Sequence, residues 1–538
     1  MLGSHPDLDL QPTSKGDFLR AGGVLLHPTA LPGEGWAGDF GDVPAFIDWL
    51  ARHRMSLWQV LPLSPPGPGH SPYTSVSSHA GNPSLVDLKS LIADGLLEPA
   101  EIERSVRETS AAADAHRRTG TAGMADLGRA ARAKMDALTL AADRFRQGRG
   151  QQHEVFSDWF ERHSGWLDLD SAFHAASVHH GSTDWRRWPH ALARAEPDAI
   201  ARLMAERADL VHRWRFIQWQ FDRQWRALRE RARIAGIRIV GDLPIYCAMD
   251  SVDVWADQDL FELDDAGMPT AVAGVPPDAF SATGQHWGNP LYRWPEHARS
   301  GFQWWRSRID GALARCDLLR LDHFRGLASY WRIPAGSADA RIGTWEPGPG
   351  LALFEVLFQQ TPREALIIED LGMLTEDVFA LREVLRLPGM RVLQFGFGRD
   401  GDPHHLPHNF TPDSVVYTGT HDNDTTLGWW QSADPSVHWH LRDYCGRVGK
   451  RADRLMIRLA FASVADLAIV PMQDVIGAGG EARMNRPGEA DAQWCWRLQE
   501  GQLRETDGRF LARLARLYDR APPRPATSPL SDPPAGSD

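Results

Sequence analysis

The stretch DLLRLDHFRG, residues 317–326, joins an apolar run to several charged side chains. Its leucines at positions 318, 319 and 321 predict a buried strand. The same run also contains Arg320, Asp322, His323 and Arg325, and burying such charges is costly unless they find partners. We therefore expect this strand to end at a polar pocket that its charged side chains share with residues from other parts of the chain.

Seven other short apolar runs have the same form and end at Gly, Pro, Asp or His. They are GGVLLHPTAL (22–31), SLWQVLPL (56–63), GIRIVGDLPIYC (236–247), ALIIEDLG (365–372), RVLQFGF (391–397), SVVYTGTHDND (414–424) and LAIVPMQDV (467–475). Helical patterns lie between several of the runs, at 43–53, 351–359 and 376–385, the last with Thr375 as the expected N-cap. Eight strands that alternate with helices predict an α/β protein with a (β/α)8 TIM barrel.

Two stretches between the predicted strands are too long for simple crossovers. Residues from about 86 to 233 are rich in Ala, Arg and Trp and predict a mostly helical insertion on the barrel rim. Residues from about 250 to 305 are rich in Gly, Pro and Trp and predict an active-site loop. The catalytic barrel should span 21–520, between a loose N-terminal arm at 1–20 and a disordered tail at 521–538.

The composition is that of a globular protein with one unusual feature. The 538 residues are 43% hydrophobic, and the net charge of −12 comes from interleaved acids and bases, which disfavours a nucleic-acid partner. The N-terminus lacks the apolar core of a signal peptide, no long apolar run predicts a membrane span, and four isolated cysteines suit a reducing compartment, so we expect a cytoplasmic protein. The unusual feature is a content of 22 Trp against only 7 Tyr. These tryptophans either fill the core or form flat platforms for sugar rings or bases.

Polar residues gather at the C-terminal ends of the predicted strands. They are His27, Gln59, Asp242, Arg320, Asp322, His323, Glu369, Asp370, Gln394, His421, Asp422, Asp424, Gln473 and Asp474. In a barrel these ends converge on one mouth, where the catalytic residues of such enzymes lie. A buried ion network that holds loops in place is the alternative, although such networks stabilise weakly because desolvation is costly. Carboxylates on three different strands, each beside a cation or a histidine, favour a catalytic site.

Carboxylates around one pocket meet the needs of glycosidic chemistry. A retaining mechanism uses two carboxyl groups about 5–5.5 Å apart, one as the nucleophile and one as the acid/base. Arg320 lies two residues before Asp322 on the same strand, so both side chains face the same way and the cation should lower the pKa of Asp322. Glu369 follows three apolar residues, a setting that raises the pKa of an acid.

The sequence gives little support for a metal or a cofactor. Asp422, Asp424 and Thr426 share part of a calcium-loop pattern, but its glycine and its closing glutamate are absent. The segment DPHHLPHNF (402–410) lacks a usual zinc spacing and reads better as a polar loop at the pocket rim. No Gly-x-Gly-x-x-Gly or Walker motif occurs. We therefore expect neither a metal nor a cofactor.

Segments along most of the chain resemble the 4-α-glucanotransferases, also called amylomaltases or disproportionating enzymes, of the α-amylase clan. They are GVLLHPTALPG (23–33), SLWQVLPLSPPGPGHSPYTS (56–75), AGNPSLVDL (80–88), GDLPIY (241–246), GVPPDAFSATGQHWGNPLY (274–292), LRLDHFRG (319–326), EDLG (369–372), LPGMRVLQF (387–395), GTHDNDT (419–425) and EARMNRPG (481–488). The combination of the segments at 274–292, 319–326 and 481–488 is specific to this family. The resemblance implies a barrel with inserted subdomains and without the C-terminal β-sandwich of ordinary α-amylases.

The resemblance also implies roles for individual residues. Asp322 matches the nucleophile, Glu369 the general acid/base, and Asp422 the third carboxylate, which holds ring hydroxyls at the reacting subsite. The matching substrate-binding positions are Arg320, Asp242 and His421 around that subsite, Tyr73 on the sugar path, Phe280 and Trp287 in a loop that closes over the acceptor side, and Asn485 near the active centre.

The implied activity is transfer of α-1,4-glucan segments from a donor maltooligosaccharide to the 4-OH of glucose or another glucan, through a covalent glycosyl-aspartate. Glycogen and starch-derived glucans belong to the same substrate class. Ala279, His286 and Gly480 depart from the family pattern and bear on acceptor preference and product size. The alternatives are an α-1,4-glucan hydrolase of the same clan and a non-catalytic glycan-binding barrel.

Overall fold

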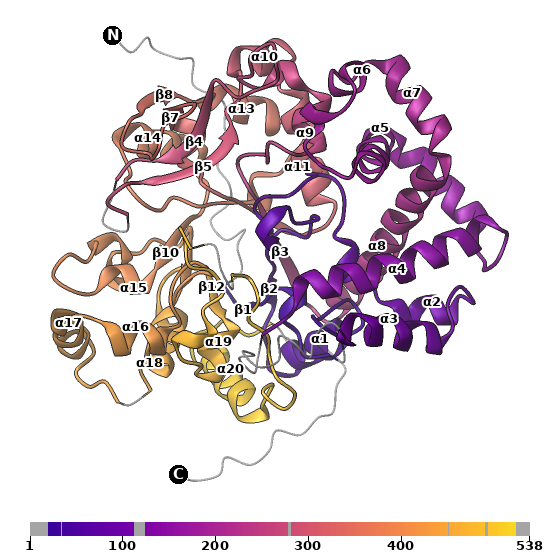
Figure 1. The fold of residues 1–538 in the computed structure, drawn as a ribbon. Coiled ribbons are helices and arrows are strands. Elements are labelled where there is room, and N and C mark those ends of the chain that lie inside the picture. Colours follow the sequence, from indigo (N-terminus) through magenta and orange to yellow (C-terminus); the bar gives the residue numbers. More distant parts are fainter. Residues whose placement is uncertain are drawn as a thin grey trace.

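A closed barrel of eight parallel strands forms the centre of the protein (Figure 1). The computed structural model describes residues 20–33, 35–111, 124–277, 281–449, 451–489 and 493–522. The barrel strands are β1 (Ala21–Leu25), β2 (Leu57–Gln59), β3 (Arg238–Leu243), β6 (Leu318–Leu321), β9 (Leu366–Ile368), β10 (Gly389–Val392), β11 (Ser414–Tyr417) and β12 (Leu467–Pro471). They follow one another around the barrel in chain order, and β12 closes it against β1. Each overlaps one of the eight predicted runs, so the prediction of a TIM barrel is confirmed.

The barrel strands are buried on both faces, which explains why they appear in the sequence as apolar runs. Every residue of β1, β6 and β12 is buried, and Arg238 at the start of β3 is half-buried. Packing between neighbouring strands is close at Gly23, where a Cβ atom would lie 2.4 Å from the Cβ of Leu57 on β2. A side chain there would displace β2, so glycine is required by the close approach of the two strands.

The three helices predicted from their apolar spacing are all present. They are α1 (Val43–Arg52), α13 (Gly350–Leu357) and α14 (Glu376–Leu385). Thr375 does occupy the N-cap position of α14, but its hydroxyl donates to the carboxylate of Asp377 and does not cap a backbone N–H. The acids in the first turn therefore compete with the backbone for the capping side chain.

In the described part of the long stretch between β2 and β3, seven α-helices lie together on one side of the barrel (Figure 1). They are α2 (Leu88–Ala93), α3 (Pro99–Ala111), α4 (Leu127–Arg146), α5 (His153–His180), α6 (His190–Ala193), α7 (Pro197–Glu206) and α8 (Ala208–Ile234). The long helices α5 and α8 pack against each other, and α8 leads directly into β3. The predicted arm at 1–20 and tail at 521–538 lie outside the described residues, except for residues 20, 521 and 522.

A four-stranded antiparallel sheet, which the sequence did not predict, lies beside the barrel. Its order is β5 (Gln285–Pro290), β4 (Ala271–Val275), β7 (Ser329–Pro334) and β8 (Thr344–Pro347). The stretch at 250–305 is thus not the simple loop that its Gly and Pro content suggested, because it contains β4, β5, α9 (Val252–Ala256) and α10 (Trp294–Arg299). None of the helices in the described ranges has the length and hydropathy that a membrane span requires.

Candidate active site

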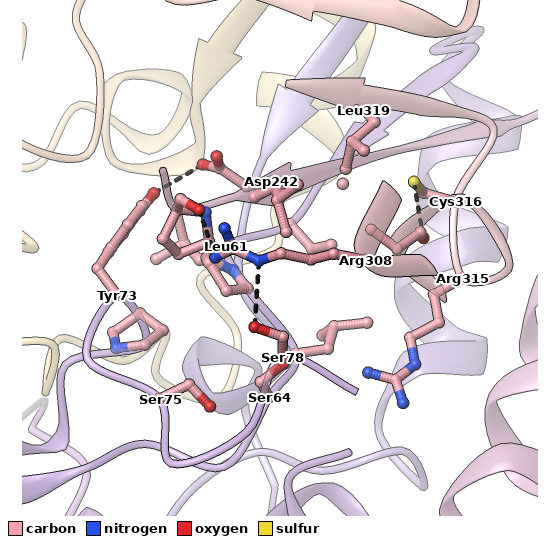
Figure 2. Close-up of a pocket in the computed structure, with 18 of the residues that line it drawn as sticks. Leu61, Ser64, Tyr73, Ser75, Ser78, Asp242, Arg308, Arg315, Cys316 and Leu319 are labelled. Atoms are coloured by element: carbon pink, nitrogen blue, oxygen red, sulfur yellow. Dashed lines mark hydrogen bonds between the residues drawn. The ribbon is translucent and has the colours of Figure 1, made fainter. Parts of the chain in front are cut away.

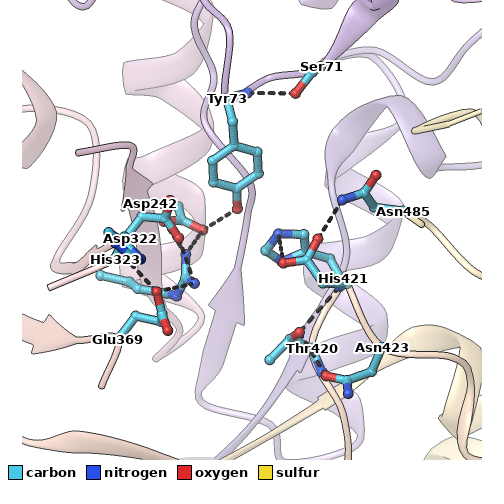
Figure 3. Close-up of polar contacts among 12 residues, drawn as sticks. Ser71, Tyr73, Asp242, Asp322, His323, Glu369, Thr420, His421, Asn423 and Asn485 are labelled. Atoms are coloured by element: carbon cyan, nitrogen blue, oxygen red, sulfur yellow. Dashed lines mark hydrogen bonds and ion pairs between the residues drawn. The ribbon is translucent and has the colours of Figure 1, made fainter. Parts of the chain in front are cut away.

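Arg320 on β6 holds together the charged residues in the barrel mouth. Its side chain is buried, and Nη1 donates to both carboxylate oxygens of Asp242 at 2.7 Å. Nη2 lies 2.8 Å from Asp322 Oδ1 and 3.9 Å from Glu369 Oε2. Asp242 is the direct partner of Arg320 in the β3–β6 register, and Figure 3 shows Asp242, Asp322 and Glu369 grouped on one side of the site. Arg320, the buried cation of the 317–326 stretch, thus has carboxylate partners on β3, after its own strand β6 and after β9.

Asp322 and Glu369 lie close enough to act on the same bond. They follow the adjacent strands β6 and β9, and each has an oxygen within 3.9 Å of the same guanidinium nitrogen. These two oxygens can therefore be no more than about 7 Å apart. The separation of roughly 5–5.5 Å that characterises retaining glycosidases falls below that limit.

Two backbone N–H groups orient the Glu369 carboxylate. Oε2 accepts a hydrogen bond from His323 N at 2.6 Å, and Oε1 accepts one from Leu371 N at 3.1 Å. His323 has a φ of 46°, a left-handed conformation that costs energy for a residue other than glycine. The strained turn after β6 thus directs an N–H group at the carboxylate of the next strand. His323 was predicted among the polar residues of the barrel mouth but was given no role there.

Desolvation in the barrel mouth controls the protonation of both carboxyls. It raises the pKa of Asp322 and that of Glu369, and for each group the guanidinium of Arg320 opposes the rise. The pKa of Asp322 is therefore not lowered, as its neighbouring cation had suggested, because desolvation outweighs the ion pair. Arg320 lies nearer to Asp322 than to Glu369, so Asp322 is the easier of the two to ionise. Asp322 also raises the pKa of Glu369.

Asp422 belongs to a second group of residues that follows β11. Its Oδ1 accepts a hydrogen bond from Asn485 Nδ2 at 2.5 Å, and its Oδ2 lies 3.3 Å from His421 Nε2. Arg483 Nη2 donates to the Asp422 carbonyl at 2.6 Å. The EARMN segment is thus held against the turn that carries Asp422. Desolvation lowers the pKa of His421 despite the nearby carboxylate, which favours a neutral imidazole.

Tyr73 connects the two groups. Its hydroxyl donates to Asp242 Oδ2 at 2.6 Å, while its ring stacks on His421 with centroids 5.1 Å apart and planes 12° apart. Trp494 contacts both rings, at 5.6 Å from Tyr73 and 5.8 Å from His421. In Figure 3 the Tyr73 hydroxyl points into the space between Asp322 and His421. No motif in the sequence indicated Trp494, and Arg483, although it lies in the EARMNRPG segment, was given no role, since each contacts residues that are distant along the chain.

The loop expected to close over the acceptor side is described only in part. Trp287 on β5 lies edge-on to the ring of His323, with centroids 4.8 Å apart, and 6.1 Å from Tyr246. It therefore lies beside the turn that orients Glu369. Phe280 and its neighbour Ala279 fall outside the described residues.

Several of the predicted polar residues have structural partners. Asp370 accepts a hydrogen bond from Met390 N and pairs with Arg382 and Arg391, and Asp474 accepts hydrogen bonds from the hydroxyls of Thr418 and Thr426. Of the remaining predicted polar residues, His27, Gln59, Gln394 and Gln473 are buried. Asp424 is half-buried, and its Oδ1 accepts a hydrogen bond from Thr425 N at 2.8 Å. The alternative of a buried ion network therefore describes Asp370, while the group around Arg320 also includes partly exposed acids. Within the described ranges, no group of three or more His, Cys, Asp or Glu side chains could hold a metal ion.

A pocket adjoins the Arg320 group behind Tyr73 (Figure 2). It is a small pocket of about 50 Å³ that opens to solvent. Its walls include Tyr73 and Asp242, the loop that follows β2, and Arg308 on α11 (Gln303–Leu313). Polar side chains such as Ser64, Ser75 and Ser78 face this space (Figure 2).

Comparisons with known proteins give one consistent result. The sequence profile of the family described as 4-alpha-glucanotransferase matches residues 26–503. The 4-alpha-glucanotransferase of Thermus thermophilus is 41% identical over 513 residues, which cover 93% of this chain and 99% of that protein. The chloroplastic/amyloplastic 4-alpha-glucanotransferase of Solanum tuberosum is 40% identical over 489 residues, with 89% of this chain and 82% of that protein covered. Among solved structures, an amylomaltase from Streptococcus agalactiae in complex with acarbose superposes with a TM-score of 0.86 at 32% identity and covers 94% of this chain and 100% of its own.

Proposed function

Because the chain belongs to the 4-alpha-glucanotransferase family, we propose that it transfers α-1,4-glucan segments by a retaining, double-displacement mechanism. The donor is a maltooligosaccharide or a glycogen- or starch-derived glucan, and the acceptor is the 4-OH of glucose or of a second glucan. The observation that carries the proposal is the pair formed by Asp322 and Glu369, which share one guanidinium nitrogen at the barrel mouth. The acarbose complex of the Streptococcus agalactiae amylomaltase supports a saccharide substrate.

In the first displacement Asp322 attacks the anomeric carbon of the donor while Glu369 protonates the departing glycosidic oxygen. The two carboxyls are suited to opposite roles, because Arg320 favours ionisation of Asp322 and desolvation keeps the proton on Glu369. The hydrogen bonds from His323 N and Leu371 N hold the acid in one orientation. The product is a covalent glycosyl-aspartate with inverted configuration.

In the second displacement the 4-OH of the acceptor attacks the same anomeric carbon. Glu369 takes the proton from this hydroxyl, and the bond to Asp322 breaks, so that two inversions restore the original configuration. We assign to Asp422, with Asn485 and His421, the binding of ring hydroxyls at the reacting subsite, since these polar groups lie across the site from Asp322. Trp287, beside His323, is placed to exclude water from the intermediate and so to favour transfer over hydrolysis.

A product profile from maltotriose tests the reaction type. A glucanotransferase releases free glucose and also forms glucans longer than maltotriose, whereas a hydrolase forms only shorter products. A non-catalytic glycan-binding barrel would bind maltotriose without changing it. The longer glucans are the expected result, and their absence during complete degradation of maltotriose would reject the transferase.

The nucleophile is tested by Asp322→Asn. The variant should lose several orders of magnitude in the rate of maltotriose disproportionation, because an amide cannot form the covalent intermediate. Asp48→Asn is the matched control, since Asp48 is exposed and pairs with Arg231 on the surface. Circular dichroism and thermal melting should show that both variants fold. If Asp322→Asn keeps activity within about tenfold of the wild type, Asp322 is not the nucleophile.

A further inference from the structure

The loop that carries Tyr73 is anchored to the helices between β2 and β3 through residues 75–82, which we name the anchor segment. Ser77 Oγ donates to Asp170 Oδ2 on α5 at 2.5 Å. Gly81 N donates to Gln218 Oε1 on α8 at 2.7 Å, and Gln218 Nε2 donates back to Gly81 O at 3.0 Å. Two of the helices thus reach the loop through buried, hydrogen-bonded side chains.

The contact between Asp170 and Ser77 is buried on both sides. Asp170 is 4% exposed and Ser77 is 1% exposed. Trp214 Nε1 on α8 donates to the other carboxylate oxygen of Asp170 at 3.0 Å. The Ser77 hydroxyl oxygen in turn accepts hydrogen bonds from His79 N at 3.1 Å and Ala80 N at 2.9 Å. One carboxylate therefore fixes the hydroxyl that closes the turn of the anchor segment.

The close approach of the helices is also built into the backbone. A Cβ atom on Gly81 would lie 2.2 Å from Phe221 Cδ1 on α8, so this position accepts no side chain without a shift of α8 or of the loop. Further along the segment, Ser78 N donates to Asp253 Oδ2 on α9 at 2.9 Å, and Arg308 Nε donates to Ser78 Oγ at 3.1 Å. The anchor segment is a fixed point for the chain that precedes it.

Tyr73 itself has open space on one side. Tyr73 and Ser75 line the pocket that lies between this loop, β3 and α11 (Figure 2). The ring is therefore held from its other side, by His421, Trp494 and the hydrogen bond to Asp242, and by the hydrogen bonds of its own loop. The preceding residues add a narrow hairpin, in which Gly67 N donates to Thr74 O at 2.9 Å and Pro66 forms a bridge with Ser75.

We propose that Asp170, on a helix remote from the barrel mouth, is a positioning residue for glucan transfer: through Ser77 and the anchor segment it holds Tyr73 against Asp242 and His421. The inference rests on the function proposed above, since it concerns how Tyr73 is positioned in the active site of the transferase. It gives the helices between β2 and β3 a part in catalysis. The competing explanation is that Asp170 only stabilises the packing of α5 on α8.

Asp170→Asn separates these explanations when it is compared with Asp168→Asn. Asp168 lies on the same helix, but its side chain is 44% exposed and pairs with Arg215. The asparagine at 170 presents an N–H group to one of two donors, Ser77 Oγ or Trp214 Nε1, and so leaves a buried donor unsatisfied. We expect kcat/KM for maltotriose disproportionation to fall about tenfold in Asp170→Asn and to stay within about twofold in Asp168→Asn.

A double-mutant cycle with Tyr73→Ala tests whether the effect passes through Tyr73. If Asp170 acts by placing this ring, Asp170→Asn should reduce kcat/KM less than about twofold further once the ring is gone, while its effect on the melting temperature stays the same in both backgrounds. A full tenfold loss in the Tyr73→Ala background would show that Asp170 acts elsewhere and would overturn the inference. So would wild-type kinetics in Asp170→Asn alone.

Failure of the proposed function and failure of the positioning role give different experimental results. A wild-type enzyme that forms no glucan longer than maltotriose rejects the proposed function itself, whereas an active wild type with an unaffected Asp170→Asn rejects only the positioning role. If Asp170→Asn does not fold, Ser77→Ala removes the same hydrogen bond with a smaller change and enters the same cycle. It must then show the same dependence on Tyr73, and independent effects would overturn the inference.

Discussion

Replacing Arg320 by methionine tests the electrostatic basis of the site. Arg320 is 3% exposed and contacts three carboxylates, those of Asp242, Asp322 and Glu369. Methionine has a similar length and would lie beside Met390, whose sulfur is 3.4 Å from Arg320 Nε. Removing one partner of a buried ion pair costs about 3–5 kcal/mol because the remaining charge is left uncompensated. Unfolding entropy of about 2.1 cal/mol/K per residue converts this cost into a melting-temperature decrease of roughly 3–4 °C for 538 residues.

The decrease in melting temperature caused by Arg320→Met should be larger at high pH than at low pH. Arg320 lowers the pKa of both Asp322 and Glu369, so its removal raises the pKa of these folded-state carboxyls further. In the unfolded chain the same groups ionise near pH 4. Between that pH and the raised folded-state values, the unfolded chain is ionised while the folded variant holds its protons, so stability falls as pH rises. The variant should therefore lose little melting temperature near pH 5 and the full amount near pH 8.

The measurement is thermal unfolding of wild type and Arg320→Met at several pH values, followed by circular dichroism. Arg231→Met serves as the control, because Arg231 and Asp48 form a pair whose side chains are 47% and 51% exposed, and such surface pairs contribute about 0–1 kcal/mol. A decrease in melting temperature that is equal at pH 5 and pH 8, or larger at pH 5, would refute the reasoning. Disproportionation of maltotriose should be abolished at neutral pH, since Asp322 would then be protonated.

Two further variants test separate parts of the structure. Glu369→Gln should lose activity on maltotriose but retain part of it on an activated donor such as a maltosyl fluoride, whose leaving group needs no proton; an equal loss on both donors would exclude Glu369 as the acid. Arg520→Met should lower the melting temperature by several degrees without changing kcat/KM, because the fully buried Arg520 side chain donates to five backbone carbonyls at the base of the barrel. The exposed Arg516 on α20 (Glu505–Leu517) provides the control Arg516→Met, and equal melting temperatures in the two variants would contradict the prediction for Arg520.

The barrel was predictable because its strands are buried on both faces, so each strand leaves an apolar run in the sequence. The strands of the antiparallel sheet do not appear as apolar runs in the sequence. Most residues of β5 and β8 are exposed or half-buried, and glycines such as Gly284, with a φ of 69° between β4 and β5, are typical of loops. A strand of this kind is defined by its partners across the sheet, and those are set by the tertiary structure.

Within the site, contacts made within one strand or between the ends of barrel strands could be predicted from the sequence. Contacts between other distant segments could not. The contact between Arg320 and Asp322 could be read from the two-residue repeat of a strand, and the contact with Asp242 from the convergence of barrel strands. Trp494 against Tyr73, and Asp170 against Ser77, join segments that no local pattern relates. The pKa of Asp322 was mispredicted for a similar reason, because the sequence shows the neighbouring cation but not the desolvation.

The sequence also could not separate the acids that act from the acids that support, since both kinds follow barrel strands. In the structure, the acids that we propose to act are more exposed than two acids that pair with arginine. Side chains of the three acids assigned to catalysis are 24% exposed for Asp322, 12% for Glu369 and 43% for Asp422, whereas those of Asp242 and Asp370 are 0% and 1% exposed. A carboxylate that is fully enclosed and paired with arginine has no face left for a sugar, while one that is partly open can exchange solvent for substrate. The charged run at 317–326 thus contains both kinds of residue. Arg320 is buried, while Asp322, two residues later, is partly exposed and is positioned by its ion pair with Arg320.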